Sequence, residues 1–119
     1  MPMNQSNALL DQEQISNLKE LFNEGLEEFL KTFMNDFEKK EKELNTVLED
    51  KNLEQAAKIA HSLKGSSANI GAKSLAAACQ QLESATKSAD LQKSLEEYKS
   101  IQIIYPQVKQ AFQEIFSHK

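Results

Sequence analysis

The sequence predicts an all-α protein: an antiparallel up-and-down four-helix bundle with a short additional N-terminal helix. The chain holds only 3 Gly and 2 Pro, too few for the turns of a β-sheet, while helix-favouring Ala, Leu, Glu, Lys and Gln dominate. Four long segments repeat apolar residues at spacings of three and four, as in helices with one buried side. Short connections between these segments favour consecutive helices that lie side by side and antiparallel.

Length and charge limit the classes of function. The 119 residues suit one domain. Because the net charge is −4 and all 14 basic residues are lysines, the arginine forks that bind nucleic acids are missing, and we expect no nucleic-acid partner. No apolar run approaches the ~20 residues needed to cross a membrane, and no signal-peptide pattern is present. Together with a single cysteine, Cys79, these features predict a soluble, cytoplasmic protein.

The N-terminal part divides at Asp11. Residues 1–10 are polar and aperiodic, so we predict a mobile segment there and a single domain over 11–119. Asp11 is a suitable N-cap for a short helix. The apolar residues of this helix fall on one side: Ile15, Leu18, Leu21 and Phe22. We expect this helix to act as a lid on the bundle.

The segment 23–50 is the clearest helix of the sequence, because its apolar residues form a continuous stripe from Leu26 to Leu48. Charged residues fill positions 38–43. Such a charge run usually forms a solvated helix face. We therefore interpret it in that way and not as a binding site.

Two further helices follow at Asn52 and after Gly71. Asn52 is followed three residues later by Gln55, which predicts a reciprocal capping box and a helix to about Asn69. Gly71 is suited to end that helix. The apolar stripe of the next helix consists of Leu75, Ala78, Cys79, Leu82, Ala85, Thr86 and Ala89.

The last helix begins after Asp90, its predicted N-cap. Pro106 removes the hydrogen bond to the carbonyl of Gln102 and disfavours helix at Tyr105. We therefore expect the last helix to be kinked or broken near Pro106. Its apolar stripe consists of Leu91, Leu95, Tyr98, Ile101, Tyr105, Val108, Phe112, Ile115 and Phe116.

His61 is the main candidate for chemistry, since the other histidine, His118, lies next to the end of the chain. On a helical wheel, His61 falls roughly 100° from the centre of the apolar stripe. A histidine satisfied within the core would lie nearer that centre. The stripe consists of Leu53, Ala56, Ala57, Ala60, Leu63 and Ser67. We therefore expect an imidazole on the flank of the helix with one nitrogen in reach of solvent.

Two lysines and a glycine surround His61 at helical spacing. Lys58 lies one turn before it, and Lys64 and Gly65 lie one turn after it. Glycine inside a helix costs about 0.5 to 1 kcal/mol relative to alanine, so Gly65 requires a reason. It either leaves space for another backbone to approach His61 or allows tight packing against a neighbouring helix.

An exposed imidazole among lysines suits few reactions. A general base would require a nucleophile and an oxyanion site, and a metal ligand would require companions, which the sequence does not provide. Cys79 lies in the middle of its stripe, where a core role is the better interpretation. The remaining role is a nucleophile that takes up an anionic group, stabilised by lysine charge.

The segment Ala60-His61-Ser62-Leu63-Lys64-Gly65-Ser66-Ser67 closely resembles the histidine-containing phosphotransfer (HPt) domains of two-component phosphorelays. The resemblance continues through Ile70-Gly71-Ala72, Leu75, Cys79 and Leu82-Glu83. The surrounding helix pattern, with Asp50 shortly before the histidine helix, is compatible with the family over nearly the whole chain.

This resemblance implies a monomeric bundle whose His61 is phosphorylated through Nε2. It implies that Lys64 stabilises the phosphoryl oxygens and that Gly65 leaves space for the loops of a receiver domain. Glu83 matches a position where several members have a glutamine that hydrogen-bonds the imidazole, and Lys87 matches a basic position in some. The glutamate is a departure: it can hold Nδ1–H, but its charge opposes phosphate.

The partners implied are receiver domains of a hybrid sensor histidine kinase, of a response regulator, or of both. The receiver would supply the aspartate, a lysine and the Mg²⁺, so we expect no cofactor or metal on this chain and no ATP-dependent kinase activity. The expected docking surface consists of Ala57, Lys58, Ser62, Gly65, Ala68 and Asn69, with Leu18 and Phe22 as further candidates. For Leu18 and Phe22, lining of the core is an equal alternative.

Two other functions remain open. An adaptor bundle could keep the HPt shape and bind receiver or kinase domains without carrying phosphate. Glu83 favours this reading, and phosphate incorporation would distinguish it. The dimerisation helices of a histidine kinase also present a histidine, but four stripes in one chain and the Lys64-Gly65 pair argue against them. That reading requires a dimer, so the mass in solution would decide.

Overall fold

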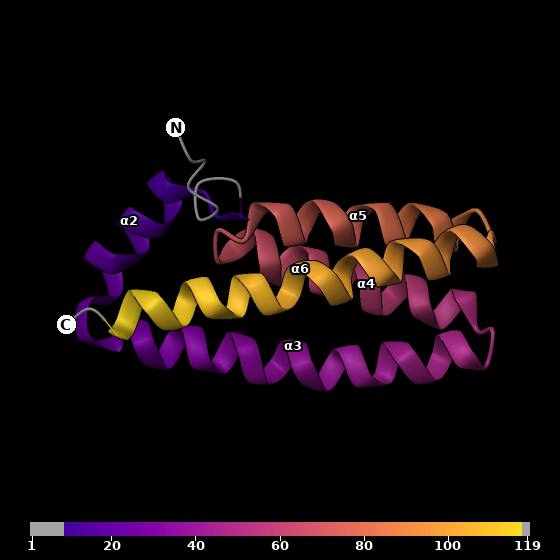
Figure 1. The fold of residues 1–119 in the computed structure, drawn as a ribbon, viewed down its shortest axis with the longest axis horizontal. Coiled ribbons are helices and arrows are strands. Elements are labelled where there is room, and N and C mark those ends of the chain that lie inside the picture. Colours follow the sequence, from indigo (N-terminus) through magenta and orange to yellow (C-terminus); the bar gives the residue numbers. More distant parts are fainter. Residues whose placement is uncertain (1–8, 118–119) are drawn as a thin grey trace.

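The computed structural model describes residues 9–117 and shows an all-α bundle (Figure 1). The long helices α3, α4, α5 and α6 run along its long axis, and each reverses the direction of the one before. A shorter helix, α2, lies across one end of the bundle. The elements within this range are α2 (Gln12–Phe22), the 3₁₀ turn η1 (Asn23–Gly25), α3 (Leu26–Glu49), α4 (Leu53–Asn69), α5 (Lys73–Lys87) and α6 (Leu91–Ser117).

The apolar stripes meet in one core. Helix α4 packs against α3 and α5, α6 packs against α5, and a lighter contact between α6 and α3 closes the bundle. Full burial of one large apolar side chain stabilises the fold by roughly 1.5–3 kcal/mol. The largest fully buried side chains are Phe37, Phe112, Leu10, Leu30, Leu44, Leu63, Ile70, Leu75, Leu82, Ile101 and Val108. The predicted stripes thus form the core that holds α4 in place.

Helices α3, α4 and α5 end in the same way. The residue after each C-cap has a positive φ: 60° at Lys51, 81° at Gly71 and 59° at Ala89. The following N–H then reaches back to a carbonyl in the last turn, which is the Schellman motif. These bonds join Asn52 N to Val47 O (2.8 Å), Ala72 N to Ser67 O (2.9 Å) and Asp90 N to Ala85 O (3.1 Å). The connections are short because the residue that closes one helix also caps the next.

The Asn52 and Asp90 caps are confirmed, with one correction. Oδ1 of Asn52 accepts from the N–H of Gln55 (3.1 Å), and Oδ1 of Asp90 accepts from the N–H of Lys93 (2.9 Å). The reciprocal capping box is wrong, because the Asn52 N–H donates to Val47 instead. The backbone N–H of Asn52 is therefore used in the Schellman turn and does not donate to the side chain of Gln55, as a capping box would require.

Helix α2 covers the end of the bundle at the turn between α4 and α5, as expected for a lid. Oδ1 of Asp11 accepts from the N–H of Gln14 (3.1 Å), which confirms the predicted cap. The Asp11 N–H donates to the carbonyl of Gly71 (2.7 Å). A Cβ at Gly71 would lie 3.1 Å from Cδ1 of Ile15. Gly71 therefore serves both the positive φ and the close approach of α2.

The N-terminal boundary and the apolar face of α2 differ from the prediction. Residues 1–8 of the predicted mobile segment lie outside the described residues. Leu9 and Leu10 are buried in the core, so the packed part of the chain begins before Asp11. Leu21, predicted on the apolar face, is 75% exposed, because α2 packs mainly through Ile15.

The start of α6 is rotated relative to the prediction. Leu95 is 41% exposed, and Ser94 is buried instead. Oγ of Ser94 donates to the carbonyl of Asp90 (2.6 Å). A serine that meets its hydrogen bond within its own helix can be buried at little cost. The side chain of Phe116 lies outside the described residues.

Pro106 lies inside α6, which continues through it to Ser117. Of the two outcomes expected there, the break does not occur. The neighbouring Tyr105 is buried and stacks on Phe37, with ring centroids 4.5 Å apart and planes inclined by 6°. Its hydroxyl donates to Glu38 Oε2 (2.7 Å). This packing holds the helix together although the proline contributes no N–H.

Candidate functional site

His61 lies in the middle of α4 and points away from the core. Its side chain is 67% exposed. Ala60, Leu63 and Ser67 on the other side of α4 are fully buried. The predicted position on the flank of the helix is therefore confirmed, and a satisfied core histidine is excluded.

Glu83 of α5 lies beside His61 and is almost fully buried, with 4% of its side chain exposed. Its Oε2 is 2.9 Å from Nδ1 of His61. Lys87 makes the largest contribution to lowering the pKa of Glu83 to about 2, and Lys64 and His61 add to it, although burial alone would raise this pKa. An ionised carboxylate only accepts hydrogen bonds. The proton of a neutral His61 ring therefore lies on Nδ1, and Nε2 carries the free lone pair.

Two lysines complete the cluster around Glu83. Nζ of Lys87 is 2.9 Å from Oε2, and Nζ of Lys64 is 3.0 Å from Oε1. Lys64 also donates to Oε1 of Gln80 (3.0 Å). The carboxylate is thus compensated from three sides, which allows a charge to be buried here. Gln80 was not predicted as part of the site.

Gly65 faces open space. Among the described residues, a Cβ placed on it would meet no atom of another element within 4 Å. Tight packing of a neighbouring helix is therefore wrong as the reason for this glycine. The alternative, an open surface one turn from His61, agrees with the structure.

Lys40 of α3, which was not predicted as part of the site, contacts the residue next to His61. Its Nζ donates to Oγ of Ser62 (2.8 Å) and lies 3.1 Å from Oδ2 of Asp36. Residues 38–43 are therefore not a uniformly solvated face, and that interpretation is wrong for Glu38, Lys40 and Glu41, which are partly buried. Helix periodicity could have signalled Lys40, since it lies on the side of α3 that faces α4.

The other residues predicted for docking lie on two helices. On α4, Lys58, Ala68 and Asn69 are exposed, and Ala57 and Ser62 are half-buried. The carbonyls of Ala68 and Asn69 accept from Nε2 of Gln14 (2.9 and 2.8 Å).

On α2, Leu18 packs partly against the core, and Phe22 is 36% exposed. The ring of Phe22 stacks on Phe29, with centroids 4.4 Å apart. An apolar hollow of about 320 Å³ borders Ser66 and Asn69 between α3 and α4.

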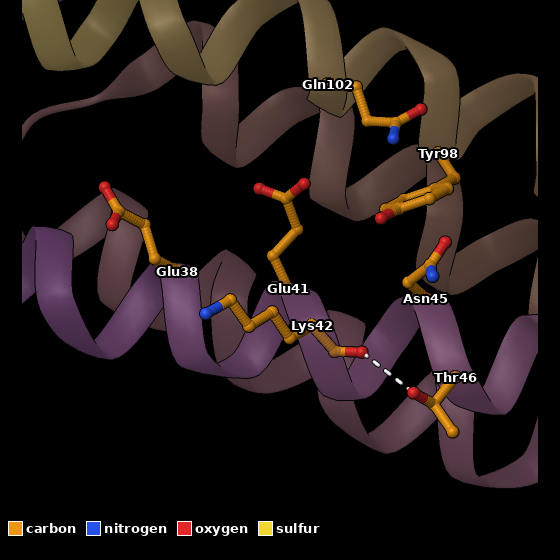
Figure 2. A pocket seen from close by; sticks show the side chains of 7 residues that line it. All are labelled: Glu38, Glu41, Lys42, Asn45, Thr46, Tyr98 and Gln102. Atoms are coloured by element: carbon orange, nitrogen blue, oxygen red, sulfur yellow. Dashed lines mark hydrogen bonds between the residues drawn. The ribbon is translucent and has the colours of Figure 1, made fainter.

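A second, polar hollow of about 600 Å³ lies between α3 and α6 (Figure 2). Glu41 and Tyr98 point into it from the two helices. Burial raises the pKa of Glu41, and burial together with Glu41 raises the pKa of Tyr98 to about 12. All of its lining residues belong to α3 and α6. It is therefore separate from the cluster of His61 and Glu83 on α4 and α5.

Other reactive groups do not join the site. Cys79 is buried, and burial raises its pKa to about 12, so a core residue is the correct interpretation. Within residues 9–117, no three His, Cys, Asp or Glu side chains gather as they would around a metal ion. No helix in this part of the chain is long and apolar enough to cross a membrane.

The geometry of an exposed histidine backed by a buried acceptor agrees with the comparisons. The family model for the Hpt domain matches residues 26–117. The chain belongs to the HPt domain family. Comparison with curated proteins found no match to this HPt domain.

Solved structures of HPt proteins have the same fold. Histidine-containing phosphotransfer protein B from Pseudomonas aeruginosa PAO1 is similar with a TM-score of 0.88 and 26% identity, covering 92% of this chain and 96% of that one. A putative HPt protein from rice has a TM-score of 0.85 and 26% identity, covering 94% of this chain and 82% of that one. An HPt protein from Medicago truncatula has a TM-score of 0.86 and 25% identity, covering 94% of this chain and 80% of that one. These matches support a phosphotransfer role in a phosphorelay, as a phosphocarrier that interacts with receiver domains.

Proposed function

We propose that His61 accepts a phosphoryl group from the aspartyl phosphate of one receiver domain and passes it to the aspartate of another. The observation that carries this proposal is the 2.9 Å contact between Nδ1 of His61 and Oε2 of Glu83. It leaves the lone pair of Nε2 on a side chain that is otherwise largely exposed. A neutral imidazole held in this way is a nucleophile that needs no further activation.

The transfer is a direct exchange of bonds. Nε2 forms a bond to phosphorus while the bond between phosphorus and the receiver's aspartate oxygen breaks, and the aspartate leaves as a carboxylate. Lys64 lies one turn from His61, and its Nζ can turn from Glu83 and Gln80 to the phosphoryl oxygens. Lys87 then remains as the counter-charge of Glu83. Positioning and charge neutralisation account for most of the acceleration in phosphoryl transfer.

The receiver docks on the surface around His61. Gly65 gives its loops access, because a Cβ on it would meet no other element of residues 9–117 within 4 Å. Exposed or partly exposed side chains around the site form the rest of the contact. In our proposal these are Ala57, Lys58, Ser62, Ala68 and Asn69 on α4, with Leu18 and Phe22 on α2.

We assign the Mg²⁺ of the reaction to the receiver domain. The chain then needs neither a metal nor a nucleotide of its own, and it acts as a monomer in the cytoplasm without ATP-dependent kinase activity. A single histidine backed by Glu83 is sufficient for a carrier, since the receivers supply both aspartates.

The test is a transfer assay. A receiver domain is charged with a small phosphodonor and mixed with this chain, and protein-bound phosphate is assayed for acid lability and base stability. We expect such phosphate on the wild type and none on His61→Gln. Absence of label on the wild type, with a panel of receivers that do charge another HPt domain, would overturn the proposal and favour a phosphate-free adaptor.

A further inference from the structure

The side chain that contacts Nδ1 of His61 is the charged carboxylate of Glu83. Glu83 contacts Nδ1 of His61 at 2.9 Å, and its low pKa keeps it ionised at neutral pH. A glutamine of the same shape would accept the same hydrogen bond without a charge. The carboxylate therefore adds an electrostatic attraction for a positively charged ring.

We propose that Glu83 keeps Nδ1 of His61 protonated after Nε2 has taken up the phosphoryl group. The phosphorylated ring is then an imidazolium. The phosphohistidine therefore loses its phosphoryl group quickly and is a short-lived intermediate. The inference rests on the proposed function only in that His61 carries phosphate. Glu83 acts as a positioning residue, because it works through the ring and does not touch phosphorus.

The proton and electron balance of the cycle follows from this contact. When Nε2 attacks, its lone pair becomes the N–P bond, the Nδ1 proton stays in place, and the ring gains a positive charge. When the N–P bond breaks, its electron pair returns to Nε2 and the ring becomes neutral again. If Nδ1 lost its proton in between, the leaving group would be an anionic imidazolate, which is a poor one. Retention of the proton makes both donation and hydrolysis fast.

Charged groups near His61 come from three helices. Lys58 and Lys64 belong to α4, Lys87 and Glu83 to α5, and Lys40 with Asp36 reaches Ser62 from α3. The lysines oppose a cationic ring. However, in the phosphorylated state Lys64 turns to the phosphoryl oxygens, Lys87 pairs with the carboxylate of Glu83, and Lys40 pairs with Asp36. Glu83 directly contacts Nδ1, so its effect on the proton dominates.

The experiment uses phosphoramidate, which phosphorylates histidine without a receiver. The full chain, its Glu83→Gln variant and a short unstructured peptide containing the sequence around His61 are phosphorylated, each with ¹⁵N-labelled histidine. Nitrogen chemical shifts then report whether Nδ1 carries a proton across a pH series, and phosphorus NMR gives the rate of phosphate loss.

We expect Nδ1 to stay protonated to higher pH in the wild type than in the peptide or in Glu83→Gln. Phosphate loss from Glu83→Gln should be roughly tenfold slower at mildly alkaline pH, the difference between a charge-assisted and a neutral hydrogen bond. Equal proton retention in the wild type and the peptide would overturn the proposal, and this comparison remains decisive even if the variant does not fold.

A second variant separates electrostatics from structural damage. Lys87→Gln removes a cation that compensates Glu83 without touching the ring. We expect it to extend protonation of Nδ1 to higher pH, opposite to Glu83→Gln, whereas shifts of the same sign would contradict the proposal.

Transfer from receivers is assayed separately. If it fails while these shifts appear, the proposed function is wrong and this inference stands; if the wild type takes no phosphate from phosphoramidate, the inference falls.

Discussion

Replacement of Gly65 by alanine should stabilise this protein and impair phosphotransfer at the same time. Gly65 lies in the interior of α4, and a Cβ there meets no atom of another element within 4 Å in the part of the chain that the structure describes. No steric penalty therefore offsets the better helix propensity of alanine. The same open surface is the place where we propose that the receiver's loops approach His61.

The size of the stabilisation follows from helix propensity. Exchange of glycine for alanine in an exposed helix interior contributes about 0.5 to 1 kcal/mol to the free energy of unfolding. The unfolding entropy of a domain is about 2.1 cal/mol/K per residue, or roughly 0.25 kcal/mol/K for this chain. Gly65→Ala should therefore raise Tm by about 2 to 4 °C.

Urea unfolding and thermal melts measure the stability, and the initial rate of phosphate uptake from a charged receiver measures transfer. Gly65→Leu should reduce that rate further than Gly65→Ala, because the added side chain is larger. Gln110→Leu serves as the matched control, since it adds a leucine at an exposed position of α6 and should leave the rate unchanged. A less stable Gly65→Ala, or a Gly65→Leu that transfers at the wild-type rate, would refute the reasoning.

Three further predictions concern the site and the turns. Lys64→Ala should slow phosphate uptake by roughly 10- to 100-fold in single-turnover kinetics, because a charge that meets the phosphoryl oxygens is lost; an unchanged rate would contradict its role. Since the pKa of Glu83 is lowered from 4.5 to about 2, its ionised form stabilises the fold above about pH 4.5, and this contribution disappears as the pH falls towards 2. Glu83→Gln should be less stable than the wild type by roughly 1–3 kcal/mol at pH 7 in urea unfolding, and the difference should narrow in acid; a constant difference would contradict the assignment. Ala89→Gly should raise the free energy of unfolding by up to about 1 kcal/mol in the same assay, because glycine accepts the positive φ at this turn without strain; destabilisation would show that the turn tolerates alanine freely.

Periodicity and capping residues predicted the fold well. The apolar stripes define the buried faces of α3 to α6, and Asp11, Asn52 and Asp90 cap the helices for which they were predicted. One error arises where two residues compete for one position. Ser94 replaces Leu95 in the core because its hydroxyl is satisfied within α6, and a hydropathy pattern does not represent that hydrogen bond.

The central residues of the site were predicted from the sequence, but two residues around them were not. The exposure of His61 followed from the helical wheel, and the placement of Glu83 and Lys87 followed from the resemblance to HPt domains. Lys40 was missed because residues 38–43 were interpreted as a solvated charge run, although helix periodicity places it on the side of α3 that faces α4. Gln80 was missed because its contact with Lys64 depends on how α5 is placed against α4. The buried, ionised state of Glu83 was not predictable either, since it depends on two lysines and a histidine that come from two helices.

The most direct test of the central claim is a reconstituted relay. One receiver domain is charged with labelled phosphate and purified, then mixed with a second, uncharged receiver in the presence of this chain. We predict that label appears on the second receiver only when the wild-type chain is added, and that His61→Gln transfers none. Equal labelling with His61→Gln would show that His61 is not the carrier and would contradict the account.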